Sequence, residues 1–219
     1  MSESTLSTSA ESQSELAYRA LETLIVTMKL APSELVTEQS LANLIGMGRT
    51  PVREAIQLLA SEHLIEVIPR RGLRIPPIDL RRQSRLLELR KVLEDLVASQ
   101  AAKRANRAAR DEMRQLAYAF RNEGSGDYDA FLSIDHAFNQ AVASMCDNEF
   151  AIGALQKLHG LSRRFWHYYS GHEEDLAEVA DIHANIAEAI ADGDPKAASA
   201  AVRVHMQYIQ RFTLTILSQ

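Results

Sequence analysis

Hydrophobic residues recur at helical spacing over three stretches near the start of the chain. The first covers about residues 16–29, and a proline-containing turn ends it. The second covers about residues 38–45, where Thr37 can cap the first turn, and the third runs over about residues 50–62. Gly46-Met47-Gly48 lies between these two and predicts a turn. The pattern therefore predicts helix, helix, turn and helix.

The pattern changes from helical to strand-like at residue 64. Residues 64–69 are rich in aliphatic side chains and predict a strand, and residues 73–76 predict a returning strand. Arg70-Arg71-Gly72 predicts the tight turn that joins them. Three helices followed by a hairpin are typical of a winged helix-turn-helix. We expect this DNA-binding domain to span residues 15–77.

Every segment from residue 80 onward has a helical pattern, and short turns separate most of the segments. The predicted helices cover about residues 80–105, 107–122, 128–145, 148–170, 174–191 and 195–217. Amphipathic helices with short connections indicate an all-α bundle over residues 80–217. The predicted fold is thus mainly α: an N-terminal winged helix-turn-helix with a small β-hairpin, and a C-terminal helical bundle.

Composition adds constraints to this fold. Residues 1–14 are rich in Ser, Thr and Glu without an apolar stretch, which predicts a disordered tail. No apolar run approaches the roughly 20 residues that a membrane span needs. Cys146 is the only cysteine, so no intrachain disulfide can form, and we expect a cytoplasmic protein with no membrane partner. The net charge of −5 leaves nucleic-acid binding to locally clustered arginines.

Two arginine clusters stand where a winged helix-turn-helix contacts DNA. Arg49, Thr50 and Arg53 begin the predicted recognition helix, whose N-terminal residues reach base edges in the major groove. Arginine can pair bidentately with guanine, and Thr50 suits phosphate. Arg70-Arg71-Gly72 at the hairpin tip suits the adjacent groove or backbone. The alternative is that these arginines are only a solvated face and that Gly72 only makes a turn.

The segment from Leu35 to Pro76 closely resembles the DNA-binding domain of the GntR family of bacterial regulators. The run Arg49-Thr50-Pro51-Val52-Arg53-Glu54-Ala55 carries most of the resemblance, and Pro69-Arg70-Arg71-Gly72 adds to it. The resemblance implies that Arg49, Thr50 and Arg53 contact operator DNA and that Gly72 lies at the tip of the wing. Gly48 stands where serine is usual, which puts one phosphate or capping contact in doubt.

Three polar residues in the second half could form a metal site. Asp135 falls beside the apolar face of its predicted helix, with Asn139 one turn later. His183 and His205 each lie about 14–15 Å from the loop that joins their helices, so they reach similar heights in an antiparallel hairpin. A carboxylate and two imidazoles can hold a divalent metal with open positions. Packed or salt-bridged side chains are the alternative. The histidines at positions 63, 136, 159, 167 and 172 have no comparable partner and are expected to be ordinary surface or packing residues.

Arg90 lies in an apolar stripe and could bind a carboxylate ligand bidentately. The alternative for Arg90 is an internal salt bridge, with Asp135 or Glu94 as candidates. Arg164 lies between apolar residues and is a second, poorer candidate for effector binding.

Residues 80–217 resemble the FCD ligand-binding domain of the FadR branch of the GntR family. The matching pieces include Glu88-Leu89-Arg90 with Leu93-Glu94, Asp135 with Phe138, and Ile182-His183 with His205. The resemblance implies a divalent metal (Zn, Ni or Mn) held by Asp135, Asn139, His183 and His205, with a small carboxylate effector beside it. Asn139 stands where the family has a histidine, and an amide oxygen is a harder and generally weaker ligand, so affinity or metal choice can change.

These inferences predict a homodimeric transcription regulator that binds double-stranded operator DNA. The resemblance favours a repressor that a small carboxylate effector releases, and it favours a regulator over an enzyme. One rival is a helical metal-dependent hydrolase fused to a DNA-binding module, since an open metal site can activate water. The other rival is a DNA-binding protein whose bundle serves only dimerisation.

Overall fold

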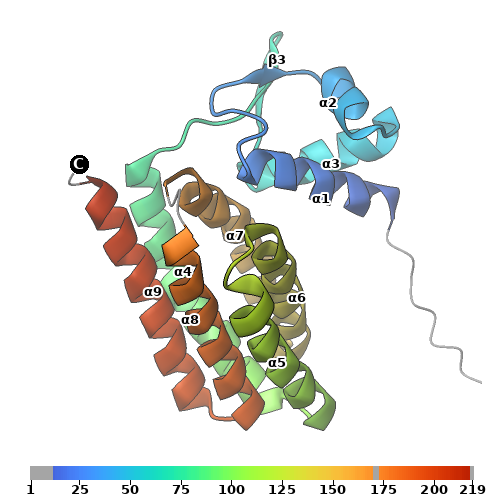
Figure 1. Cartoon of the computed structure of the whole chain (residues 1–219). Helices are drawn as coiled ribbons and strands as arrows, with labels where there is room; N and C mark the ends of the chain where they lie inside the picture. Colours follow the sequence, from blue (N-terminus) through green and yellow to red (C-terminus); the bar gives the residue numbers. More distant parts are fainter. Residues whose placement is uncertain (1–11, 170–172, 218–219) are drawn as a thin grey trace, which may run out of the picture. The chain divides into compact units, whose positions relative to one another are not determined.

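The computed structural model describes residues 12–169 and 173–217, which divide into two compact units, residues 1–78 and 79–219 (Figure 1). The fold is mainly α with one small sheet, as the sequence predicts. Much of the predicted N-terminal tail, and the predicted surface residue His172, lie outside the described residues. None of the helices in the described part combines the length and apolar character that crossing a membrane requires.

The N-terminal unit contains three helices and a three-stranded antiparallel sheet. Its elements are α1 (Gln13–Val26), β1 (Leu35–Val36), α2 (Glu38–Ile45), α3 (Arg49–Ser61), β2 (Glu66–Ile68) and β3 (Gly72–Arg74), with the strand order β1-β3-β2. Leu21 and Ile25 of α1 are fully buried, as are Val52 and Leu59 of α3, and the two helices pack together. This core fixes α3 so that its first turn stays on the surface.

Two features of this unit differ from the predicted pattern. Helix α1 begins at Gln13, because Ser12 and Glu15 form a reciprocal capping box that satisfies free amides of the first turn. Residues 13 and 14 are therefore helical, not part of a tail. Strand β1 was not predicted. It is only two residues long, and Val36 pairs with Leu73, so its formation depends on β3.

The C-terminal unit is a bundle of long helices (Figure 1). Its elements are α4 (Leu80–Arg104), α5 (Arg107–Ala119), the π-helical turn η1 (Phe120–Gly124), α6 (Tyr128–Cys146), α7 (Glu149–Tyr169), α8 (Glu173–Asp192) and α9 (Pro195–Leu217). Helix α4 packs against α6, α7, α8 and α9, while α8 also packs against α5. Side chains that α4, α6, α7, α8 and α9 direct inward therefore meet in one place.

The predicted helix over residues 107–122 is wrong in its last turn. Helix α5 ends at Ala119 and continues as the π-helical turn η1, which places Phe120 fully inside the core. Gly124 ends this turn against α6, where an added Cβ would meet the Ile134 side chain at 3.3 Å and Phe131 Cα at 3.4 Å. The wider turn follows from this close packing, which the hydrophobic pattern of α5 does not reveal.

Candidate functional site

The turn before α3 leaves the start of that helix open. Gly46 ends α2 in the left-handed conformation, at φ 67°, which glycine adopts without strain. Gly48 is the N-cap of α3 and supplies no side-chain hydrogen bond, as expected where glycine replaces serine. Arg49 and Thr50 are exposed on the first turn. Uncapped amides at a helix N-terminus suit an anionic oxygen such as that of a phosphate.

Arg53 is oriented by a carboxylate on the neighbouring helix. Its Nη2 and Nε donate to Glu38 Oε2 at 2.8 and 3.1 Å, and both side chains are exposed. The hydrogen bond from Arg53 lowers the pKa of Glu38, and the charge of Arg49 lowers it further. Both guanidinium groups therefore lie on the same side of the α2–α3 pair, and Glu38 limits how far Arg53 can turn.

The wing has a well-defined tip. The Arg71 amide donates to the Ile68 carbonyl at 3.0 Å, with Pro69 and Arg70 as the central residues, and Arg70 has a φ of 63°. This is the arrangement of a type II turn. Both arginines are exposed there. Gly72 has a φ of 98°, and an added Cβ would meet the Val36 carbonyl oxygen at 3.0 Å. The pairing of β3 with β1 thus explains why glycine is needed at position 72, apart from any close approach to a ligand.

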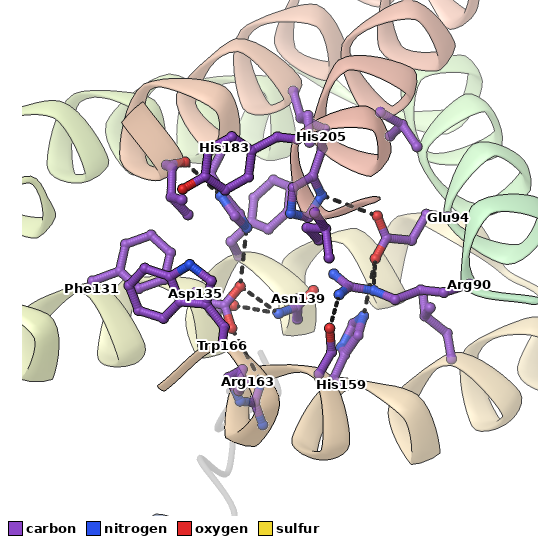
Figure 2. A pocket seen from close by; sticks show the side chains of 18 of the residues that line it. Arg90, Glu94, Phe131, Asp135, Asn139, His159, Arg163, Trp166, His183 and His205 are labelled. Carbon is purple, nitrogen blue, oxygen red and sulfur yellow. Dashed lines mark hydrogen bonds and ion pairs between the residues drawn. The ribbon is translucent and has the colours of Figure 1, made fainter. Parts of the chain in front are cut away.

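The C-terminal bundle encloses a cavity, here called the central cavity, between α4, α6, α7, α8 and α9 (Figure 2). Its wall is largely apolar and aromatic, with polar side chains at Arg90, Glu94, Tyr128, Asp135, Asn139, His159, Ser162, Arg163, Trp166, His183, His205 and Tyr208. The volume is about 90 Å³. Since one water needs roughly 10–15 Å³ by this measure, the cavity has room for several waters or one small organic molecule.

Asp135 projects into the central cavity from α6 and is 7% exposed. Asn139 Nδ2 donates to its Oδ1 at 2.9 Å, and Arg163 Nη1 donates to its Oδ2 at 3.1 Å. Burial raises the pKa of Asp135, but the Arg163 guanidinium and other nearby groups outweigh burial, so the net shift is downward. Asp135 is therefore an ionised carboxylate inside the wall, paired with an arginine.

The two predicted histidines lie together opposite Asp135 (Figure 2). Their ring centroids are 4.5 Å apart. His183 Nδ1 lies 2.8 Å from the Val179 carbonyl, which can only accept, so Nδ1 carries the proton and the Nε2 lone pair faces Asp135 Oδ1 at 3.7 Å. Burial, with His205 beside it, lowers the pKa of His183 to about 4. His205 Nδ1 lies 3.2 Å from Glu94 Oε2.

Arg90 forms the internal salt bridge that the sequence analysis gave as the alternative to effector binding. It lines the central cavity, and its guanidinium forms an ion pair with Glu94 while donating to Ser162 Oγ. Arg90 and Glu94 are 7% and 8% exposed. Burial raises the pKa of Glu94, but the charge of Arg90, with His205 and His159, reverses this and holds the pKa well below its usual range. The pair is a buried salt bridge with Glu94, one of the two partners proposed from the sequence.

Of the two adjacent arginines of α7, the one that lines the central cavity is Arg163, not the Arg164 that the sequence analysis named. Arg164 is buried away from the central cavity, near Arg82, and burial lowers its pKa to about 10. Its predicted part in effector binding is not supported by this position. Arg163 lines the cavity instead, and so does His159, which the sequence analysis set aside. The spacing of His159, Arg163 and Trp166 marks one face of α7 and could have identified both.

The predicted metal ligands are near one another but do not form a complete metal centre. Among residues 12–169 and 173–217, no three His, Cys, Asp or Glu side chains gather closely enough to hold a metal ion. Asp135 and His183 face each other, His205 adjoins His183, and the Asn139 amide nitrogen bonds Asp135. The two imidazoles nevertheless suit ligation, because metal-binding histidines hold their other ring nitrogen on a carbonyl or carboxylate.

Comparison with known proteins matches both halves of the chain to families. Residues 13–75 match "Bacterial regulatory proteins, gntR family", and residues 85–208 match "FCD domain". An uncharacterized HTH-type transcriptional regulator of Streptomyces ambofaciens is 29% identical, covering 88% of this chain and 81% of that protein. The HTH-type transcriptional repressor RspR of Escherichia coli is 25% identical, covering 88% and 85%.

Solved structures share the fold over nearly the whole chain. The E. coli protein McbR/YncC superposes with a TM-score of 0.78 at 18% identity, covering 95% of this chain and 100% of that one. A putative GntR regulator from Rhodococcus sp. RHA1 superposes with a TM-score of 0.66 at 20% identity, covering 94% and 99%.

Proposed function

This chain belongs to the GntR family of bacterial transcription regulators and carries an FCD domain, and we propose that a small carboxylate in the central cavity controls its binding to operator DNA. The family is one of regulators, not enzymes, so the rival reading as a hydrolase is set aside. The observation that carries the proposal is the buried guanidinium of Arg90 on the wall of a small, mostly apolar cavity. A carboxylate can bind such a group, because a guanidinium has five N–H donors and the contacts with Glu94 and Ser162 use only some of them.

The proposed DNA-binding surface consists of the start of α3 and the tip of the wing. Arg49 and Arg53 would read base edges, Thr50 would contact phosphate, and Arg70-Arg71-Gly72 would contact the neighbouring groove or backbone. The exposure of all these residues and the open first turn of α3 support this assignment.

A divalent metal in the central cavity is the second part of the proposal. Asp135, His183 and His205 would hold it, with Asn139 contributing an amide oxygen if its side chain turns over. Zn, Ni and Mn are all compatible with such a set of nitrogen and oxygen donors. When bound, the metal supplies positive charge that attracts the effector carboxylate. The orientation of both imidazoles by carbonyl and carboxylate partners supports this part.

We further propose that the regulator acts in the cytoplasm as a homodimer that places two copies of α3 on one operator. Leu89, Val92 and Leu96 form an exposed apolar face along α4, which a second copy could cover. The effector controls the protein only if it binds one arrangement of the dimer better than the other, and operator and effector then affect each other's affinity equally. The relatives named as repressors favour release of operator DNA by the effector.

Replacing Arg49 with alanine tests the DNA-binding assignment. We expect specific operator affinity to fall by about 1–3 kcal/mol, the value of one bidentate contact to a base, with the fold unchanged. Titration of the operator against both proteins at one fixed salt concentration measures this loss. Lys29→Ala removes an exposed charge elsewhere in the same unit and should leave the specific affinity nearly unchanged. If Arg49→Ala and wild type bound the operator with equal affinity, α3 would not be the helix that contacts the bases.

Replacing His183 with alanine tests the sensing site. We expect less bound metal and a weaker response of operator binding to candidate small carboxylates, because one imidazole ligand is lost. Native mass spectrometry of the full chain reports metal, retained ligand and oligomeric state together. Asp111→Ala removes an exposed carboxylate paired with Arg114 and serves as the control. Normal metal content in His183→Ala would exclude His183, and no effector response in wild type would favour a bundle that only dimerises.

A further inference from the structure

Asp135 forms an ion pair with an arginine, and it is also the only carboxylate among the proposed metal ligands. Its Oδ2 accepts from Arg163 Nη1 at 3.1 Å, while its Oδ1 lies 3.7 Å from His183 Nε2. Figure 2 shows the guanidinium and the imidazole approaching the carboxylate from different helices. A cation that binds Asp135 and His183 therefore has to share a carboxylate whose charge Arg163 already balances.

We propose that Arg163 competes with the divalent metal for Asp135 and thereby sets the metal affinity of the central cavity. The inference rests on the proposed function only in placing the metal at Asp135. A guanidinium and a divalent cation on one buried carboxylate repel each other, and the low dielectric of the wall makes that repulsion strong. Metal loading is favoured when Arg163 leaves Asp135, and metal is held weakly while Arg163 stays.

Asn139 makes this competition more influential than it would be in a site with three imidazoles. Its Nδ2 donates to Asp135 Oδ1 at 2.9 Å and to the Asp135 carbonyl at 2.8 Å, so the amide supports the carboxylate in its arginine-bound position. With fewer imidazole ligands available, more of the metal affinity has to come from the charge of Asp135. Competition from Arg163 for the Asp135 carboxylate then has a larger effect on the metal affinity.

A released Arg163 would have a use in the same cavity. Tyr128 Oη and Trp166 Nε1 belong to side chains that line it, and both are buried without a hydrogen-bond partner in the described part of the chain. Tyr128 stacks on Trp166 with centroids 5.3 Å apart, and the Arg163 charge is near enough to lower the pKa of the Tyr128 hydroxyl, although burial raises that pKa overall. Arg163, Tyr128 and Trp166 together offer donors for a carboxylate, so metal and carboxylate would bind with positive coupling.

Zinc binding to the full-length protein tests the proposal with the ion alone. Trp166 is the only tryptophan in the chain, so its fluorescence reports events in the central cavity. After removal of metal, Zn²⁺ affinity is measured by competition with a chromophoric chelator while the fluorescence is recorded. We expect Arg163→Gln to bind Zn²⁺ roughly tenfold more tightly than wild type, because the substitution removes a positive charge that repels the metal across a short, poorly screened distance.

Three further variants make the result specific. Arg163→Met keeps the apolar stem and should tighten binding in the same direction, which keeps the test open if the glutamine variant folds poorly. Asp135→Asn should lose Zn²⁺ binding. Arg121→Gln, which removes a surface arginine paired with Asp181 and Glu188, should match wild type.

Equal or weaker Zn²⁺ affinity in both Arg163 variants overturns the competition, and so does absence of Zn²⁺ binding in all the proteins. These outcomes are distinct from failure of the proposed function. Suppose that operator binding still responds to a carboxylate while the Arg163 variants bind Zn²⁺ as wild type does. The proposed function as an effector-controlled regulator would then stand, and only the competition between Arg163 and the metal would be wrong.

Discussion

Replacing Glu94 with glutamine is expected to destabilise the C-terminal domain by about 3–5 kcal/mol, the usual cost of removing one partner from a buried ion pair. The substitution keeps the size of the side chain and removes its charge, which leaves the buried Arg90 guanidinium without a carboxylate beside it. Glu94 also accepts from His205, so the ring that adjoins His183 loses its charged partner. The loss is thus electrostatic and is concentrated in the wall of the central cavity.

Chemical denaturation followed by Trp166 fluorescence measures this loss, because the only tryptophan lies in the affected domain. The matched control is the double substitution Arg90→Met with Glu94→Leu, which removes both charges and keeps most of the volume. Apolar replacement of a whole buried pair is often neutral or stabilising, so the double variant should recover most of the stability. A single variant as stable as wild type would show that Arg90 needs no carboxylate and would weaken its assignment as a buried anion receptor.

The helix pattern was predictable from sequence because long amphipathic helices bury a regular stripe. Helices α4, α6 and α9 lie within a residue of the predicted ranges 80–105, 128–145 and 195–217. The elements that were missed depend on distant partners instead. Strand β1 exists through its pairing with β3, and the π-helical turn after Ala119 exists through packing against α6. Such contacts leave no periodic signal in their own segment.

The two candidate sites differ in how much of them a sequence can reveal. The DNA-binding residues lie in two short contiguous segments, so the motif and the turn chemistry appear together. The central cavity joins side chains from five helices, and its boundary follows from helix rotation. Neighbouring residues of a helix point about 100° apart, so an error of one residue on α7 separates Arg164, which the sequence analysis named, from Arg163, which lines the cavity. Pairing with Asp135 across helices settles the phase, and only the structure contains that contact.

Replacing Phe120 with alanine is expected to cost about 3–5 kcal/mol of stability, as for other fully buried phenylalanines, and also to weaken metal binding. The Phe120 ring lies 5.2 Å from that of His183 and 5.6 Å from that of Phe131. Phe131 in turn meets His183 edge-on, with the centroids 5.3 Å apart. These rings fix the imidazole plane that directs Nε2 at Asp135. A void at position 120 removes one side of that support, so His183 should sample other orientations.

Met113→Ala is the matched control, because Met113 is also fully buried in the same core but, unlike Phe120, has no ring that packs on His183. It should cost about 2–5 kcal/mol and leave Zn²⁺ affinity unchanged, whereas Phe120→Ala should lower both stability and affinity. Denaturation midpoints and chelator competition on the full-length proteins separate the two effects. If both variants lost stability and neither lost affinity, the ring of Phe120 would be ordinary core, and His183 would owe its orientation to the Val179 carbonyl alone. Loss of affinity in Phe120→Ala only would link the unpredicted turn after α5 to the sensing site.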